Sequence, residues 1–259
     1  MLWNAIRWGG YCPTKEYFDM FPMADGSDFD WNNPEHTANP FVNRDPRLNE
    51  TFILDGDIYQ GRTVELTQEY PSDKTNYPKG KDWGQGAMHS LSLKTGLACR
   101  KWGLDRGNEL SGHVIQWPHL RIAELYLSYA EALNEYYETP PKEAFDAVLK
   151  VRERSGMPGF PSTLNKEQFR EKLRRERAVE LAYEDHRFWD IRRWLIADDE
   201  GVMKGAMYGL QLSAVTGAPG KVHYKPYVFE NRLWSDRSYL HPIKQTEIDK
   251  GYMLQNPGW

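Results

Sequence analysis

The sequence has no long apolar run, little cysteine and no excess of basic residues, and each absence excludes a class of protein. No apolar stretch approaches the roughly 20 residues that a bilayer-spanning helix needs, which excludes a transmembrane helix. Lys and Arg number 33 against 37 Asp and Glu, a net charge of −4, so the basic stripe typical of nucleic-acid binders is missing and we expect no nucleic-acid partner. Cys12 and Cys99 are too few for a disulfide framework or a cysteine-rich zinc site, and their spacing leaves open whether they pair.

Several chemical signatures are missing as well. Residues 1–12 have neither the basic nor the apolar region of a secretory signal peptide, which leaves a protein inside the cell or a chain whose true beginning lies elsewhere. No G-x-S-x-G pattern marks a nucleophilic serine, and Gly84 and Gly86 lack the third glycine of a phosphate-binding loop. The sequence therefore predicts no catalytic residue.

Aromatic residues, by contrast, are abundant: 10 Trp, 15 Tyr and 10 Phe, many of them in segments rich in Gly, Pro, Asn and Asp. Trp and Tyr rings stack on the C–H faces of sugars, while neighbouring polar side chains reach the hydroxyls. We therefore predict a carbohydrate-binding platform in three such loops, formed by Trp31, Tyr70, Tyr77, Asp82 and Trp83. The alternative is that these rings fold down over a β-rich core.

The segment from Asp28 to Asn33 resembles the start of a calcium-binding loop. The EF-hand pattern then fails, because Asn33 stands where glycine is required and Asn39 replaces the bidentate glutamate. Asp28 and Asp30 still allow a looser calcium site, although Asx turns explain the same composition without a metal. We predict no other cofactor.

Residues 1–117 read as loops and short strands, because Pro, Gly, Asn and Asp punctuate them throughout. Thr14 is placed to cap a short helix that Pro22 ends. Residues 47–54 and 58–66 alternate like the two strands of a hairpin that is exposed on at least one face.

From Pro118 the apolar spacing becomes that of helices. The first helix carries two adjacent stripes, which indicates packing on two sides: Leu120, Ala123, Leu127 and Ala130; Ile122, Tyr126, Tyr129 and Leu133. Pro140 and Pro141 separate it from a second helix, which ends at Gly156 and carries Ala144, Val148 and Val151. The pair fits the tetratricopeptide pattern if its loop is about two residues longer than usual.

A third helix begins at Asn165, where Gln168 completes a capping box, and is expected to reach Trp194. Three of its glutamates, at positions 176, 180 and 184, share one face. Such carboxylates could bind a metal or act as general acids, but the many arginines beside them would lower their pKa values, which does not suit a general acid. We therefore predict a structural ion-pair network formed by Arg175, Glu176, Glu180, Arg187, Asp190 and Arg193.

The segment 195–259 is expected to consist of loops, with one helical turn at 245–250. No linker divides the chain cleanly. The predicted fold is mainly α with extensive loops and a few short strands, in one domain over 1–259 whose parts are 1–117, 118–194 and 195–259.

Five segments, in this order, resemble the SusD/RagB family: Asn43–Leu48, Leu120–Asn134, Val151–Gly156, Arg174–Trp194 and Tyr239–Gly258. The resemblance implies a non-catalytic, surface-exposed outer-membrane lipoprotein that binds glycans and caps a SusC-type TonB-dependent transporter in nutrient uptake. It also implies tetratricopeptide-like helices. The matching motifs are scaffold rather than site, so no sugar-contacting residue can be carried over.

Members of that family are longer, and this chain resembles only their C-terminal half. The signal peptide and the lipid-bearing cysteine belong to the other half, and Cys12 has no lipobox before it. We therefore expect membrane association only through a lipid anchor outside this chain. We also expect an exposed apolar face around Trp3, Trp8 and the helix over 118–138, unless another copy covers it.

Two other functions stay open at this point. One is a carbohydrate-active hydrolase with a carboxylate pair, whose separation no sequence can give. The other is a helical scaffold that binds only protein. The missing catalytic motifs and the resemblance favour glycan binding, without indicating which glycan.

Overall fold

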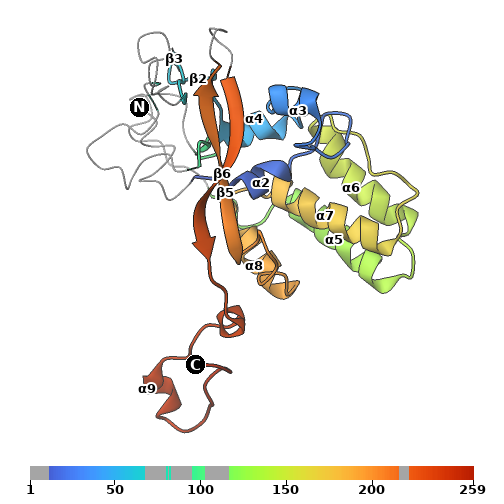
Figure 1. The fold of residues 1–259 in the computed structure, drawn as a ribbon. Helices are drawn as coiled ribbons and strands as arrows, with labels where there is room; N and C mark the ends of the chain where they lie inside the picture. Colours follow the sequence, from blue (N-terminus) through green and yellow to red (C-terminus); the bar gives the residue numbers. More distant parts are fainter. Residues whose placement is uncertain (1–11, 68–79, 81, 83–94, 103–116, 216–221) are drawn as a thin grey trace.

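The chain is mainly helical, with several short strands and one long hairpin (Figure 1). The computed structural model describes residues 12–67, 80, 82, 95–102, 117–215 and 222–259. Its helices are α2 (Lys15–Asp19), α3 (Pro34–Ala38), α4 (Arg47–Thr51), α5 (Ile122–Tyr136), α6 (Lys142–Arg154), α7 (Lys166–Glu180), α8 (His186–Arg193), the 3-10 helix η4 (Asp236–Tyr239) and α9 (Gln245–Ile248). The predicted fold class is confirmed, and within these residues no helix is both long and apolar enough to span a bilayer.

The strands form three antiparallel pairs. β1 (Phe52–Ile53) pairs with β4 (Ala98–Cys99), β2 (Ile58–Tyr59) with β3 (Arg62–Thr63), and β5 (Gly205–Ala214) with β6 (Val222–Arg232). The long β5–β6 hairpin runs through the middle of the molecule, with the helices on one side of it and the α9 tail extending beyond its end (Figure 1).

Helix α5 packs against α6, as the predicted helix pair requires, and also against α7. Asn165 accepts a hydrogen bond from the Gln168 backbone at 2.9 Å and Gln168 returns one at 3.0 Å, which confirms the predicted capping box. Small side chains let the axes approach closely, and the shared core is made of Ala123, Leu127, Ala130, Ala144, Ala147, Val148, Val151, Phe169 and Leu173.

The outer face of α5 is exposed. Ile122 and Tyr129, from the second predicted stripe, are 64% and 52% exposed, and Leu120 and Leu125 extend the same apolar surface. The helix thus packs against two neighbours, but the second predicted stripe is not buried between them and forms an exposed apolar face instead. The helix also begins at Ile122 rather than at Pro118. Trp3 and Trp8 lie outside the described residues.

The N-terminal segments surround a second core. Thr14 caps α2 by accepting a hydrogen bond from the Tyr17 backbone, as predicted. Only Phe52–Ile53 of the predicted strand over 47–54 is a strand, because α4 occupies Arg47–Thr51, where Asp45 accepts a hydrogen bond from the Arg47 backbone at 2.9 Å. The predicted hairpin is wrong: β1 pairs with β4, and both β2 and β3 lie within 58–66.

The prediction of loops between Asp198 and Pro242 is wrong, because β5 and β6 form a ten-residue ladder there. Leu210 and Leu212 of β5 enter the second core. Gly209 is required by a close approach: a Cβ at this position would lie 2.7 Å from the Thr95 backbone. The glycines of β5 and Pro226 in β6 weaken the strand pattern in the sequence.

The predicted continuous helix from Asn165 to Trp194 is interrupted. α7 ends at Glu180, and Tyr183 and Asp185 adopt positive φ angles of 54° and 65° before α8 begins. This turn lets Glu184 face Lys101 and Arg121. Charge pairing therefore compensates a backbone conformation that costs roughly 1–3 kcal/mol per non-glycine residue.

Candidate functional site

A buried ion-pair network holds the helices in place. Glu176 of α7 accepts hydrogen bonds from Arg47 of α4, at 2.6 Å, and from Arg152 of α6. All three side chains are almost fully buried. Ions desolvated in this way are stabilising only when each of them has a partner, so the network fixes how these helices lie against one another.

Glu180 lies one turn further along α7 and accepts from three arginines. The distances are 2.9 Å from Arg47, 2.6 Å from Arg121 and 2.9 Å from Arg154. Burial alone would raise the pKa of Glu180, but hydrogen bonds and charges from Arg121 and Arg47 hold it below its ordinary value. The pKa of Glu184 is lowered in the same way, against burial, by Arg121 and Lys101.

Some of the predicted network residues lie in the buried network, and others lie outside it. Asp190 and Arg193 pair at 2.8 Å, while Arg175 lies at the surface and pairs with Asp28 at 2.6 Å. Arg187 makes no ion pair with any residue in the described ranges. Sequence reasoning missed most cations of the network: Arg177 lies on α7 itself, and the others come from distant segments, namely Arg47, Lys101, Arg121, Arg152 and Arg154.

The segment Asn43–Leu48 supplies two buried arginines, Arg44 and Arg47. Arg44 donates to the carbonyl oxygens of Phe21 and Pro40 at 2.6 and 2.7 Å, and its guanidinium lies 4.1 Å from the centre of the Phe29 ring. Burial lowers the pKa of Arg44 to about 10. This family-like motif thus acts as scaffold, with Arg44 on the loop carbonyls and Arg47 on α7.

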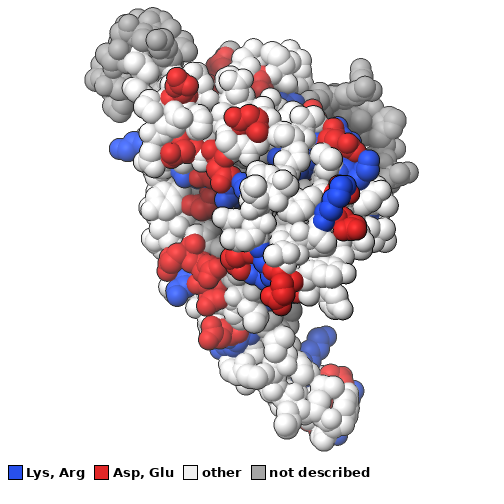
Figure 2. Space-filling model, turned by 90° about the vertical axis from the view of Figure 1, so that its right-hand side faces the viewer, with Lys and Arg blue, Asp and Glu red and all other residues white. Residues whose placement is uncertain are grey.

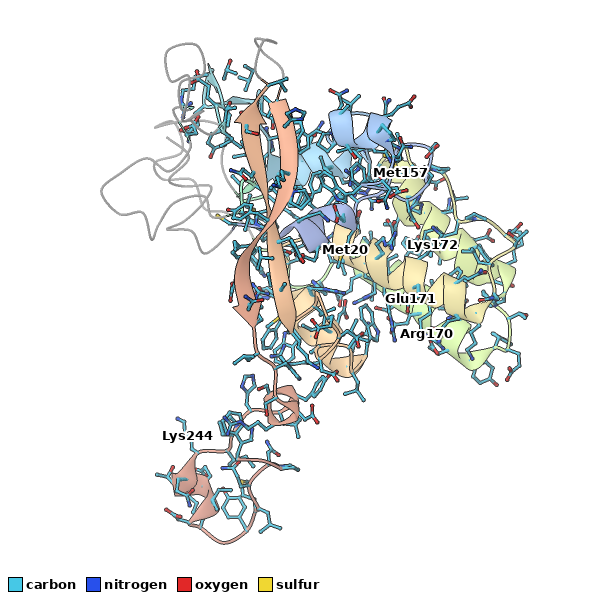
Figure 3. The ribbon with its side chains drawn as sticks, viewed as in Figure 1. Met20, Met157, Arg170, Glu171, Lys172 and Lys244 are labelled. Atoms are coloured by element: carbon cyan, nitrogen blue, oxygen red, sulfur yellow. The ribbon has the colours of Figure 1, made fainter. Side chains whose placement is uncertain are left out.

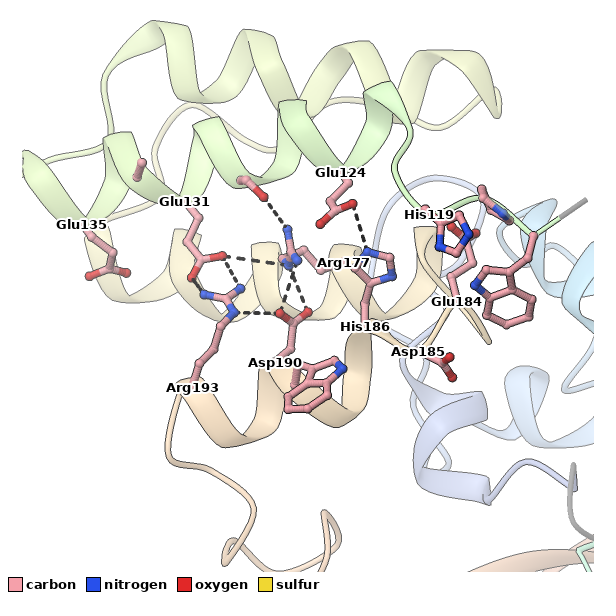
Figure 4. Close-up of a pocket in the computed structure, with 15 residues that line it drawn as sticks. His119, Glu124, Glu131, Glu135, Arg177, Glu184, Asp185, His186, Asp190 and Arg193 are labelled. Carbon is pink, nitrogen blue, oxygen red and sulfur yellow. Dashed lines mark hydrogen bonds and ion pairs between the residues drawn. The ribbon is translucent and has the colours of Figure 1, made fainter. Parts of the chain in front are cut away.

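An open groove of about 700 Å³ lies between α5, α7 and α8 (Figure 4). Two exposed tryptophans line it: Trp117, which precedes α5, and Trp189 on α8. Trp117 stacks on Trp102 with ring centres 4.9 Å apart, and Phe188 braces Trp189 edge-on at 5.0 Å. Ring faces held in this way can stack on a ligand at little cost in side-chain entropy.

Polar side chains cover the floor of the groove. Arg193 donates to Glu131 at 2.7 Å, and Arg177 donates to Asp190 at 3.0 Å (Figure 4). His186 lies with its Nε2 atom 3.0 Å from a carboxylate oxygen of Glu124. The arrangement combines stacking surfaces with hydrogen-bonding groups of both kinds, which suits the binding of a hydroxylated ligand.

Of the binding residues predicted from the sequence, the structure describes Trp31 and Asp82, and neither lines this groove. Trp31 is half-buried, donates to Asp19 at 2.8 Å and lies under the Lys15 ammonium group. Asp82 accepts two hydrogen bonds from Arg62, which, against the effect of burial, lower the pKa of that carboxyl below its ordinary range. Tyr70, Tyr77 and Trp83 lie outside the described residues.

The two aspartates of the looser calcium site have protein partners. Asp28 accepts from Arg175, and Asp30 accepts from the Asn32 backbone at 2.8 Å in an Asx turn. Across the described ranges, no group of three or more acidic, histidine or cysteine side chains converges in a way that could hold a metal ion.

Basic side chains do not form a continuous stripe on the face that Figure 2 shows, where Lys and Arg alternate with Asp and Glu. On α7, Arg170, Glu171 and Lys172 illustrate this mixture (Figure 3). A phosphate-tracking surface would need one sign of charge to dominate.

Comparisons with known proteins show what the sequence and the fold resemble. A curated relative, SusD-like protein P25 of Formosa agariphila, is 36% identical over 106 residues, which are 38% of this chain and 19% of the relative. A solved SusD-like protein of Bacteroides fragilis is 28% identical, with a TM-score of 0.74 over 97% of this chain and 47% of the other. A SusD-like carbohydrate binding protein of the same species is 26% identical, with a TM-score of 0.67 over 92% of this chain and 47% of the other.

These structures define the fold as SusD-like. The SusD family model matches residues 3–259, and the chain belongs to the SusD family. It spans about half the length of the solved relatives and less of the curated one.

Proposed function

We propose that the chain is a non-catalytic glycan-binding component of a nutrient-uptake complex at the bacterial cell surface. In this proposal it acts beside a SusC-type TonB-dependent transporter of the outer membrane and is attached to that membrane by a lipid anchor outside these 259 residues. The observation that carries the proposal is the family match over residues 3–259. A solved relative at 26% identity, described as a carbohydrate binding protein, supports it.

The groove between α5, α7 and α8 supplies the binding chemistry. Trp117 and Trp189 would stack on the apolar faces of sugar rings, and the carboxylates and arginines between them would meet the hydroxyls. The loop residues predicted from the sequence, Trp31, Tyr70, Tyr77, Asp82 and Trp83, are the alternative binding candidates. The two locations make different predictions for mutagenesis.

The test is a calorimetric screen of the chain against a panel of soluble glycans. If the groove binds the glycan, Trp117→Ala and Trp189→Ala each weaken binding at least about tenfold. Trp31→Ala and Trp83→Ala test the loop platform, and Trp259→Ala, an exposed tryptophan in the tail, is the matched control.

Binding lost only in the loop variants would move the site to the loops and keep the function. Failure of every glycan to bind would overturn the proposal for this chain. Release of shorter products from the glycan mixture would contradict the non-catalytic assignment and favour a hydrolase with a carboxylate pair.

A further inference from the structure

A second cavity, of about 340 Å³, lies on the other side of α8 from the groove, between α2, α8 and residues 201–203. Its walls are mainly apolar. Met20, at the end of α2, lies where that helix meets the hairpin (Figure 3). The other apolar side chains that line it are Tyr17, Phe188, Ile191, Val202 and Met203. A cavity of this size accommodates a small organic molecule.

Arg187, in the first turn of α8, is the unusual member of this lining. Its side chain makes no hydrogen bond, ion pair or ring contact with any other residue that the structure describes. Burial lowers the pKa of Arg187. The guanidinium is partly buried and receives no acceptor from the described residues, so its N–H donors are available to a ligand. The helix end beside it is also uncapped, because Asp185 makes no side-chain capping bond.

Glu16 of α2 is the complementary group in the same lining. One carboxylate oxygen accepts from the Tyr208 backbone at 3.0 Å. The other oxygen, Oε2, is buried and has no partner among the described residues. Glu16 and Arg187 do not pair with each other, so one unmet acceptor and one set of unmet donors border a single apolar space.

The charges of the cavity are balanced overall. The charged residues of its lining are Glu16 and Asp185 against Arg187 and Arg232, and Arg232 already lies 3.5 Å from Glu230. A simple anion would satisfy Arg187 and leave Glu16 unmet, and a simple cation would do the reverse. A ligand that satisfies both must carry a positive and a negative group next to each other, together with an apolar body.

We propose that this cavity binds a free apolar α-amino acid. Its carboxylate would pair with Arg187, whose fork of donors matches a carboxylate in bidentate geometry, beside the uncapped end of α8. Its ammonium group would donate to Glu16, and its side chain would lie against Met20, Phe188 and Ile191. Only a free amino acid carries both ionic groups on one carbon atom, so peptides are excluded from the pairing. The inference is independent of glycan binding in the groove.

The test is isothermal titration of the full 259-residue chain with L-phenylalanine and L-leucine. Two analogues each lack one ionic group: 3-phenylpropanoate lacks the amine, and 2-phenylethylamine lacks the carboxylate. We expect L-phenylalanine to bind and each analogue to bind at least about tenfold more weakly, because a buried polar group then stays unmet. Equal binding of the three compounds, or no heat from either amino acid, overturns the proposal.

Variants assign the two ionic contacts. Arg187→Met should abolish the preference for L-phenylalanine over 2-phenylethylamine and, because it breaks no hydrogen bond or ion pair with the described residues, should not strongly lower the melting temperature of the free protein. Glu16→Gln should weaken L-phenylalanine and leave 3-phenylpropanoate unchanged. Arg175→Met, which removes a surface arginine paired with Asp28, is the matched control. A loss of binding in the control as large as in Arg187→Met, or a strongly lowered melting temperature of Arg187→Met, contradicts the proposal.

Discussion

Glu180 is the residue at which most segments of the helical region meet. Its carboxylate joins α7 to α4 through Arg47, to the segment before α5 through Arg121, and to α6 through Arg154. A single buried anion thus compensates three cations that lie far apart in the sequence. Removing its charge would leave the buried Arg47 and the half-buried Arg121 with fewer carboxylate partners, whereas Arg154, whose side chain is 63% exposed, would be solvated by water.

We therefore expect Glu180→Gln to lower the free energy of unfolding by about 3–5 kcal/mol. Urea denaturation followed by circular dichroism measures this change. Glu167→Gln is the matched control, because the Glu167 side chain is 65% exposed, pairs with Arg170 at the surface and should cost less than about 1 kcal/mol. If both variants lowered the free energy of unfolding equally, Glu180 would be no more important for stability than a surface glutamate.

The same carboxylates predict how stability depends on pH. The pKa values of Glu180 and Glu184 are lowered in the folded state, because arginine and lysine partners outweigh burial. A lowered pKa contributes stability that is fully present above the ordinary value of 4.5 and is lost as the pH falls toward the folded value. The free energy of unfolding should therefore fall below about pH 5.

The acid dependence can be assigned by comparing urea denaturation of the wild type and Glu180→Gln across this pH range. The variant should show a shallower decline, since it has lost one of the groups that titrate. Parallel curves for the two proteins would mean that other carboxylates cause the acid sensitivity.

Among the elements, the β5–β6 hairpin depends on a close backbone approach at Gly209. A methyl group there would lie 2.7 Å from the Thr95 backbone, and Leu210 donates a backbone hydrogen bond to Thr95 at 2.7 Å. Gly209→Ala should therefore cost about 1–3 kcal/mol, measured by thermal unfolding. Gly159→Ala is the control, because its new methyl group would meet only the flexible end of Leu149. Unchanged stability in Gly209→Ala would show that the two segments separate easily.

The elements that could be predicted are those with local signals. Thr14, Pro141 and Asn165 lie at helix starts, and the apolar spacing of α5 to α7 follows directly from their packing. The α7–α8 break could not be predicted, because Glu184 is drawn to Lys101 and Arg121 from distant segments.

The candidate site was harder to predict than the helices. Trp117 and Trp189 become a pair of groove residues only once α5 and α8 are placed, and nothing in the spacing of their positions indicates it. Trp31 shows the converse: a loop tryptophan that looked free for a ligand donates to Asp19 and packs on the core. Single aromatics in polar loops do not reveal which of the two roles they have.

At the scale of the whole molecule, the exposed face of α5 predicts association. Ile122 and Tyr129 belong to an apolar surface of the kind that soluble proteins normally cover. We expect the chain to self-associate with rising concentration in analytical ultracentrifugation, and Ile122→Glu with Tyr129→Glu to reduce this without unfolding it. Leu149→Glu, at an exposed apolar position on α6, is the control. A wild-type chain that stays monomeric at all concentrations would contradict the expectation.

Helix α7 contributes to both cores: Phe169 and Leu173 pack with α5 and α6, and Val179 packs with the core formed by α2, α4 and the hairpin. Unfolding of one core would therefore remove the α7 side chains from the other. The two cores should unfold in a single calorimetric transition. The same shared helix limits how far the protein can be shortened. A fragment that keeps the groove must keep α7, and α7 brings with it the need for the whole second core.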